Sequence, residues 1–224
     1  MKDTGNSTFI PYTRPWIDSE EMKHRTKEFY QLMDQRRTVR MFSDTPVSRE
    51  VVENILLAAS TAPSGAHKQP WTFCAISDST MKAKIREAAE EEEFRNYHGR
   101  MSQRWLKDLE PFGTNWQKPF LEIAPWILVV FRRIFEWEGE QKVNNYYVQE
   151  SVGLAAGMLL TAIHHAGLVS LTHTPSPMNF LTEILERPDN ERPFLLIPIG
   201  YPAEDAQVPN IHRKSLEEIA LFFE

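Results

Sequence analysis

The segment 126–131, with the sequence WILVVF, is a continuous run of large apolar residues and constrains the fold more than any other feature. A strand without alternating polar residues is typically buried on both faces, so helices must cover both sides of its sheet. Three further segments (71–76, 168–171, 194–199) are short, apolar and suited to strands. Helical spacing or capping residues mark 18–35, 48–60, 79–105, 143–166 and 215–222, with Ser19 and Ser79 as expected caps.

Strands and helices thus alternate, with helices predominating. This pattern predicts an α+β protein with one sheet in a three-layer α/β/α arrangement. Residues 1–16 contain Pro11, Pro15 and Trp16 and are predicted to form an extended arm. Both ends carry apolar or aromatic residues, which could wrap a partner subunit or pack on their own domain.

Composition excludes several classes of protein. The 224 residues carry a net charge of −6, which argues against general nucleic-acid binding. The single cysteine, Cys74, excludes an internal disulfide and cysteine-rich metal sites. The nine glycines form neither GxGxxG nor a P-loop. The apolar run 152–163 is too short to span a membrane, and no signal peptide is seen. We therefore expect a soluble, cytoplasmic protein without a metal site.

Three arginines within five residues, Arg36, Arg37 and Arg40, could form a phosphate clamp, because a guanidinium pairs bidentately with phosphate. The alternative, which the residues alone favour, is that these cations stabilise the end of the preceding helix. The loop 61–71 is rich in small residues, so a flat ligand could approach its backbone, although a plain turn would look the same. In that loop Ser64 offers a hydroxyl and Ala66 a free N–H.

A third candidate group combines Glu93, Tyr97 and Lys118. Glu93 and Tyr97 are four residues apart and share one face of a helix. A carboxylate, a phenol and an ammonium group together suit an amino-acid zwitterion, with Glu93 at the α-ammonium and Lys118 at the α-carboxylate. On the residues alone, however, Glu90–Glu93 would be a solvated helix face.

The order and spacing of these motifs resemble the iodotyrosine deiodinase family, a branch of the FMN-dependent nitroreductase superfamily. The resemblance spans roughly residues 10–218. It rests on RRTVR at 36–40, APSGAH at 62–67, PWTF at 70–73, Asn96-Tyr97, Asn115-Trp116 with Lys118, and THTP at 172–175. It implies a single nitroreductase-like domain over 1–224, with a mixed, mainly antiparallel sheet between helices. It also implies a lid at about 90–120 and termini that wrap a homodimer partner.

The resemblance further implies bound FMN and the residues that hold it. Thr174 would be catalytic, as the hydrogen-bond donor to flavin N5 that supports one-electron chemistry through a semiquinone. Glu93, Tyr97, Lys118 and the Ala66 N–H would bind substrate, with that N–H meeting the phenolate oxygen. The cofactor-binding residues would be Arg36, Arg37, Thr38, Val39, Arg40, Ser64, Gly65, Thr172, His173, Thr174 and Arg213.

The implied activity is reductive dehalogenation of 3-iodo-L-tyrosine and related halotyrosines to tyrosine and halide. Two alternatives remain. One is a general FMN nitroreductase or quinone reductase that uses NAD(P)H, and the other is a non-catalytic halotyrosine-binding flavoprotein. No nicotinamide motif is visible, so the electron source could be a reductase or NAD(P)H.

Overall fold

The central strand of the fold is β2 (Trp126–Arg133), which forms where the continuous apolar run predicted a doubly buried strand. The computed structural model describes residues 11–224. Residue contacts divide the chain into two units, 1–35 and 36–224, which are taken separately. The other strands are β1 (Trp71–Ile76), β3 (Phe135–Glu138), β4 (Gln141–Asn144), β5 (Val169–Ser170) and β6 (Glu191–Gly200).

Unit 36–224 holds all the strands described, and unit 1–35 holds one helix, α1 (Ser19–Asp34). Residues 11–18 before it form neither helix nor strand, and the rest of the expected arm lies outside the described residues. No helix within 11–224 is both long and apolar enough to cross a membrane. The remaining helices are α2 (Arg49–Ser60), α3 (Ser79–Arg95), α4 (Gln103–Leu109), α5 (Phe120–Ile123), α6 (Val148–His165), α7 (Asn179–Ile184) and α8 (Leu216–Ile219).

The main sheet has the strand order β1-β2-β6-β5, and all three pairings are antiparallel. A parallel bridge between Thr38 and Ser170 makes it mixed. Cys74 pairs with Val129, Val129 with Leu196, and Leu196 with His173, so these residues form one row across the sheet. The predicted mixed, mainly antiparallel sheet is therefore confirmed.

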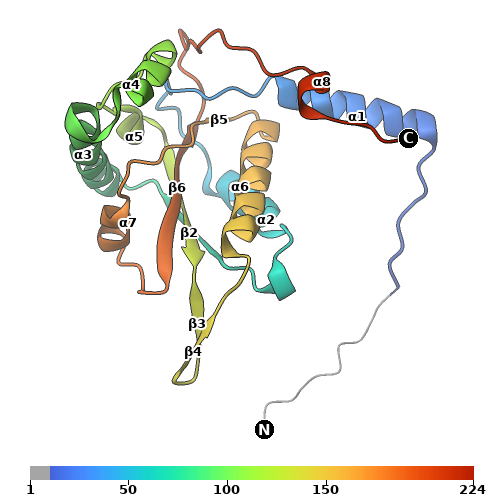
Figure 1. Ribbon diagram of the computed structural model, residues 1–224, viewed down its shortest axis with the longest axis horizontal. Coiled ribbons are helices and arrows are strands. Elements are labelled where there is room, and N and C mark those ends of the chain that lie inside the picture. Colours follow the sequence, from blue (N-terminus) through green and yellow to red (C-terminus); the bar gives the residue numbers. More distant parts are fainter. Residues whose placement is uncertain (1–10) are drawn as a thin grey trace. The chain divides into compact units, whose positions relative to one another are not determined.

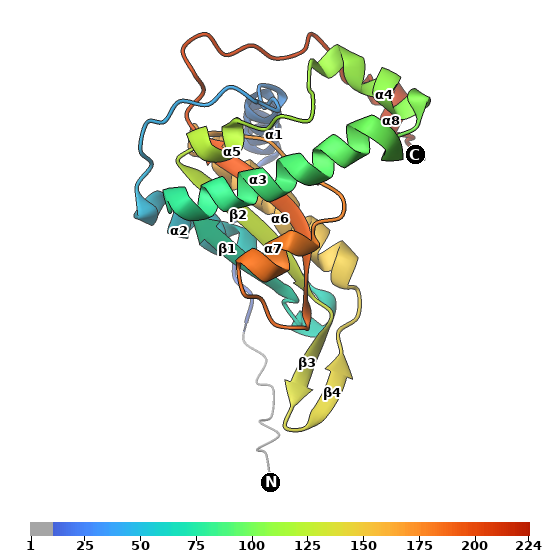
Figure 2. The ribbon, with the colours of Figure 1, turned by 90° about the vertical axis from the view of Figure 1, so that its left-hand side faces the viewer.

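Helices cover both faces of this sheet, as Figures 1 and 2 show. Leu128 and Val130 point into a core shared with α2 and α6. Ile127 and Val129 point into the opposite core, shared with α3, α5 and α7. Alternate residues of β2 thus serve different cores, which explains why the strand contains no polar residue before Arg132. The three-layer prediction is confirmed.

Several element boundaries differ from the predictions. The helix expected over 79–105 ends at Arg95, and a π-helical segment η2 (Asn96–Arg100) separates it from α4. Ser102 caps the start of α4, because its hydroxyl accepts the Trp105 N–H at 3.2 Å. The expected caps Ser19 and Ser79 are wrong by one residue. Asp18 and Asp78 cap α1 and α3, since their carboxylates accept N–H bonds of 2.9 and 2.7 Å.

The predicted helix over 143–166 starts five residues late, at Val148. The first residues of the predicted helix instead form the end of β4, which pairs with β3 in a two-stranded hairpin. The sequence pattern did not predict this hairpin. Gly139 makes the hairpin turn with φ of +66°, a conformation that glycine adopts at little cost. Figure 2 shows this hairpin extending beyond the main sheet.

Candidate functional site

A cavity of about 390 Å³ lies where the chain enters unit 36–224. Four arginines line it, together with two threonines and several apolar side chains. Its predicted members are Arg36, Arg37, Thr38, Arg40, Thr172 and Arg213, and its unpredicted members are Phe112, Leu171, Pro209, Ile211 and His212. Segments far apart in the sequence therefore meet around one cationic cavity.

Backbone pairing with the edge strand positions the arginines. The Val39 N–H donates to the Ser170 carbonyl at 3.1 Å, and the Val39 side chain is buried in the core. A buried Val39 anchors the segment while its polar neighbours turn to the cavity. Val39 does not itself line the cavity, and its N–H is already bonded to Ser170.

The C-terminal segment 209–213 closes over the arginines. The Arg213 guanidinium donates to the Arg36 carbonyl at 2.8 Å, and Arg37 donates to the Pro209 carbonyl. Burial, and then the nearby charges of Arg213 and Arg37, lower the pKa of Arg36. Burial also lowers the pKa of Arg40. An anion in the cavity would relieve this repulsion, as a phosphate group does among arginines.

A second cluster joins Glu93, Tyr97 and Lys118, which come from α3, η2 and the residue before Pro119. The Lys118 ammonium lies 3.3 Å from the Glu93 carboxylate, and both side chains are almost fully buried. The same ammonium lies 5.4 Å from the centre of the Tyr97 ring. Tyr97 donates to the Thr114 carbonyl at 3.4 Å. The structure thus brings these three predicted substrate residues together.

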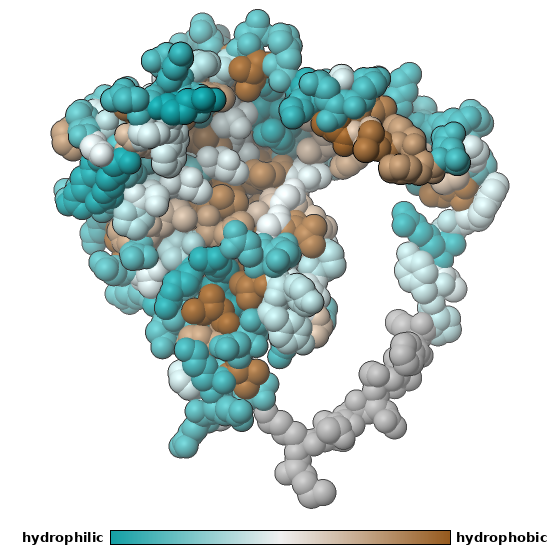
Figure 3. All heavy atoms as spheres, in the orientation of Figure 1, coloured by the Kyte–Doolittle hydropathy of each residue, from teal (hydrophilic) through white to brown (hydrophobic). Residues whose placement is uncertain are grey.

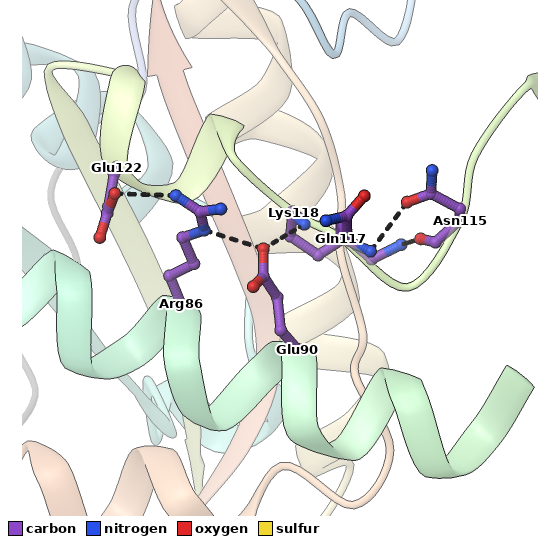
Figure 4. A network of polar contacts seen from close by, with 6 residues as sticks. All are labelled: Arg86, Glu90, Asn115, Gln117, Lys118 and Glu122. Atoms are coloured by element: carbon purple, nitrogen blue, oxygen red, sulfur yellow. Dashed lines mark hydrogen bonds and ion pairs between the residues drawn. The ribbon is translucent and has the colours of Figure 1, made fainter. Parts of the chain in front are cut away.

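Glu90 supports the Lys118 side of this cluster, and Figure 4 shows it between Arg86 and Lys118. Its carboxylate accepts the Lys118 backbone N–H at 2.6 Å and the Arg86 guanidinium at 2.8 Å. Arg86 also donates to Glu122 at 2.9 Å, which ties α3 to α5. The i, i+4 spacing of Arg86 and Glu90 is visible in the sequence and could have identified this brace.

Burial dominates the electrostatics of the second cluster. It raises the pKa of Glu93, partly offset by the Lys118 charge, and it lowers the pKa of Lys118, partly offset by Glu93. Each ion therefore depends on the other in a poorly solvated site. Burial raises the pKa of Tyr97, and the charge of Arg40, which also lines the cavity, offsets a small part of this rise, so Arg40 connects the two clusters.

The segment 172–174 runs beside the cavity after the edge strand. Thr172 and Thr174 are exposed, whereas the His173 ring between them packs edge-on against Phe120 at 5.8 Å. This alternation follows from the extended backbone, since His173 pairs with Leu196 of β6. Both threonine hydroxyls remain available to a ligand, and the His173 side chain faces the protein interior.

The buried imidazole of His173 is expected to make the folded protein less stable in acid. Burial, with the charges of Lys118 and Arg40, lowers the pKa of its imidazole to about 3. A histidine whose pKa is lower in the folded state loses stability as pH falls below the unfolded value. We expect about 2 kcal/mol less stability at pH 5 than at pH 7.5 from this group alone. Urea unfolding of wild type and His173→Thr at both pH values measures this difference in the free energy of unfolding. If the free energy of unfolding depended equally on pH in the two proteins, the prediction would be refuted.

The third predicted group, Ser64, Gly65 and Ala66, lies elsewhere. The Gly65 N–H contacts the Ser151 hydroxyl at 3.4 Å, near the start of α6. A Cβ at Gly65 would lie 2.9 Å from the Tyr147 ring, so glycine is needed there. Ala66 is exposed and left-handed, with φ of 46°. No hydrogen bond of its N–H is found within residues 11–224, so it could serve a ligand.

This loop and the threonine segment lie at opposite edges of the sheet. The loop precedes β1, and 172–174 follows β5, with two strands between them. Three strand spacings amount to roughly 14 Å. None of the three loop residues lines the arginine cavity. The structure therefore joins the first two predicted groups through Arg40, but not the third.

The sequence of this chain is similar to those of known proteins. Residues 33–201 match the model of the nitroreductase family. An iodotyrosine deiodinase of Haliscomenobacter hydrossis is 61% identical over 96% of this chain and 97% of its own length. Iodotyrosine deiodinase 1 of Mus musculus is 46% identical over 94% of this chain and 74% of its own length.

Solved structures show the same relationship. An oxidized iodotyrosine deiodinase bound to FMN and 3-iodo-L-tyrosine matches with a TM-score of 0.75 and 30% identity, over 87% of this chain and 100% of that chain. An FMN-bound nitroreductase of Bacteroides fragilis matches with a TM-score of 0.65 and 19% identity, over 88% and 99%, and shares the fold. The chain belongs to the nitroreductase family and, within it, to the iodotyrosine deiodinases.

Proposed function

We propose that this protein is an FMN-dependent enzyme that converts 3-iodo-L-tyrosine and related halotyrosines to tyrosine and halide. The observation that carries the proposal is the buried pair of Glu93 and Lys118 with Tyr97, beside the arginine cavity. Its relatives are iodotyrosine deiodinases, and one was solved with FMN and 3-iodo-L-tyrosine. In the net reaction a carbon–halogen bond breaks and a carbon–hydrogen bond forms, which consumes two electrons and one proton.

The cavity suits the phosphate end of FMN. Four guanidinium groups can supply bidentate hydrogen bonds to a phosphate, and their mutual repulsion falls when an anion enters. Thr38 and the Val39 backbone would flank the phosphate group. Thr172 also lines the cavity, and His173 and Thr174 follow it in the chain. When bound, the flavin supplies the electrons of the reaction. Thr174 would donate a hydrogen bond from its hydroxyl to the cofactor, and His173 would contribute through its backbone.

The second cluster suits the zwitterion of an amino acid. The α-ammonium group would replace Lys118 at the Glu93 carboxylate, and the α-carboxylate would pair with the freed Lys118 ammonium. Tyr97 adds its phenol, and segment 90–120 acts as a lid that excludes water from these charges. Since both ions are already buried, a ligand that pairs with both leaves no charge unsatisfied.

The Ala66 N–H would hold the phenolate oxygen of the substrate, and Ser64 and Gly65 would contact the cofactor. These residues lie at the sheet edge opposite Thr172–Thr174, so one chain alone does not gather them around one ligand. A second copy can supply them. This separation supports a homodimer in which each site uses residues of both subunits, within one nitroreductase-like domain per chain. The arm 1–16 and the C-terminal residues would wrap the partner.

Helix α6 offers the surface for such a dimer. Leu154 and Met158 are 53% and 36% exposed on it, and Gly153 and Gly157 beside them face open space. Leu57 of α2 adds a side chain that is 64% exposed. Figure 3 shows apolar surface in this region. A stripe of small and apolar residues lets another helix approach closely, so we assign this face to the dimer interface.

Leu154→Arg should therefore yield monomers. A charge at this position has no partner in a buried helix contact and costs several kcal/mol there. Light scattering coupled to gel filtration measures the mass, and fluorescence titration measures FMN affinity, which we expect to fall at least tenfold. Glu87→Arg, which places the same charge on the exposed face of α3, is the control. A Leu154→Arg dimer with normal FMN affinity would rule out this interface.

The activity is tested without oxygen. The flavin of the loaded protein is reduced chemically, 3-iodo-L-tyrosine is added, and iodide and tyrosine are measured. We expect one iodide and one tyrosine per reduced flavin. Binding without iodide release would instead identify a binding protein. Reduction of nitroaromatics by NAD(P)H without iodotyrosine turnover would identify a general nitroreductase. Replacing the chemical reductant by NAD(P)H, or by a flavoprotein reductase, then tests the electron source.

A further inference from the structure

One face of α3 carries more of the amino-acid site than Glu93 alone. Glu90 lies three residues before Glu93, on the same face of the helix. The Glu93 carboxylate lies 3.3 Å from the Lys118 ammonium, whereas the Glu90 carboxylate accepts the backbone N–H of the same lysine at 2.6 Å. Two glutamates of one helix face therefore contact Lys118 at opposite ends, one at its side chain and the other at its main chain.

The backbone of Lys118 has few other means of fixing itself. The residue belongs to neither a helix nor a strand, so its N–H takes part in no backbone ladder, and Pro119 after it has no N–H. The helix that follows, α5, has only four residues and is too short to be stable alone. The Glu90 carboxylate therefore supplies an acceptor that regular secondary structure does not.

Two earlier side chains on the same face of α3 fix the short helix α5. The buried Lys82 ammonium donates to the carbonyls of Glu122 and Ala124, at the end of α5, at 2.9 and 2.8 Å. Arg86 bridges the carboxylates of Glu90 and Glu122 at 2.8 and 2.9 Å, as Figure 4 shows. Lys82, Arg86 and Glu90 follow one another at intervals of four, so a single row of α3 sets the position of α5 and of the lysine before it.

We propose that Glu90 is a positioning residue that holds the Lys118 ammonium at the distance from Glu93 that an α-amino acid requires. The inference rests on the proposed function, in which Glu93 meets the α-ammonium group and Lys118 the α-carboxylate. A lysine ammonium sits on a flexible four-carbon stem, so it is placed well only if the backbone beneath it is fixed. Because Glu90 and Glu93 belong to one helix, α3 sets the spacing of the two charged partners. Glu90 thereby selects for ligands that carry both charged groups on one carbon atom.

A pair of ligands tests this role. 3-Iodo-L-tyrosine carries both charged groups, whereas 3-iodotyramine has the same iodophenol and ammonium group but no carboxylate. Quenching of flavin fluorescence in the oxidised, FMN-loaded protein gives the Kd of each ligand. In Glu90→Ala we expect the Kd of 3-iodo-L-tyrosine to rise about tenfold or more and that of 3-iodotyramine to change less than about threefold. In Glu90→Gln the side-chain oxygen still accepts the Lys118 N–H, so both Kd values should stay within about threefold of wild type.

Glu191→Ala is the matched control. The Glu191 carboxylate is also buried and also pairs with the arginine four residues earlier, Arg187, at 2.7 Å, but its other partner is the Thr72 hydroxyl at 2.5 Å. This substitution should lower the unfolding temperature and leave the ratio of the two Kd values unchanged. Glu90→Asp serves if Glu90→Ala does not fold. Its carboxylate keeps the charge but is one methylene shorter, so it cannot hold both Arg86 and the Lys118 N–H, and the ratio should fall as in Glu90→Ala.

The ratio of the two Kd values separates positioning from a merely structural role. If Glu90 only stabilised the fold, its loss would weaken both ligands equally or neither. Either result would overturn the positioning role and leave the proposed function intact. A wild type that does not prefer 3-iodo-L-tyrosine to 3-iodotyramine would overturn the zwitterion site of the proposed function, and this inference with it.

Discussion

Glu93→Gln should bind 3-iodo-L-tyrosine about 2–4 kcal/mol more weakly than wild type, which is roughly 30- to 900-fold in Kd. The neutral amide cannot neutralise the α-ammonium group, and the site is too buried for water to take its place. The substitution also leaves the buried Lys118 cation without its carboxylate. Quenching of flavin fluorescence in the oxidised, FMN-loaded protein measures the affinity without any turnover.

Glu91→Gln provides the control on the same helix. Its carboxylate is 64% exposed and pairs with Arg95, so its loss should change the affinity less than threefold. Lowering the pH should further distinguish wild type from Glu93→Gln. Because the pKa of Glu93 is raised, wild-type affinity should fall with decreasing pH at a higher pH than an ordinary glutamate would give, whereas Glu93→Gln should show no such loss. Unchanged affinity in Glu93→Gln would remove this carboxylate from the site.

Sequence periodicity predicted the strand 126–131 and the layers around it because burial on both faces leaves an unmistakable pattern. It could not predict the end of α3 at Arg95, because the residues of η2 are not helix breakers apart from Gly99. Asn96, the residue at that break, was missed for the same reason. Its side-chain amide donates to the Ser176 carbonyl, which is 80 positions away in the chain, so no local pattern reveals this contact.

In the candidate site, too, the sequence predicts some features and not others. Arg36, Arg37 and Arg40 are close in sequence, so they had to lie close together in space. The sequence could not show, however, toward which part of the fold their side chains point. That direction depends on Val39, which is buried and bonded to Ser170. Ser64–Ala66 precede β1, and strand order cannot be read from one sequence. Their distance from Thr172 at the opposite sheet edge therefore became visible only in the fold.

Arg36→Gln should weaken FMN binding by about 1.5–3 kcal/mol, or roughly 10- to 150-fold, because it removes one charge-assisted contact to a phosphate. Riboflavin, which has the same ring and no phosphate, should bind wild type and variant alike. The substitution keeps the Arg36 carbonyl that Arg213 contacts, so the closure by segment 209–213 remains. Titrating each flavin into cofactor-free protein, with fluorescence as the readout, gives the two affinities.

The ratio of the two affinities separates a phosphate clamp from a helix-terminal cation. If Arg36 only stabilised the end of α1, its loss would lower the unfolding temperature. It would then weaken the binding of both flavins equally, or the binding of neither. If it binds phosphate, only FMN is affected, and added salt reduces the difference between the flavins in wild type. Arg192→Gln is the control, because Arg192 is exposed, contacts backbone carbonyls and lies away from the cavity. It should leave the FMN-to-riboflavin ratio unchanged.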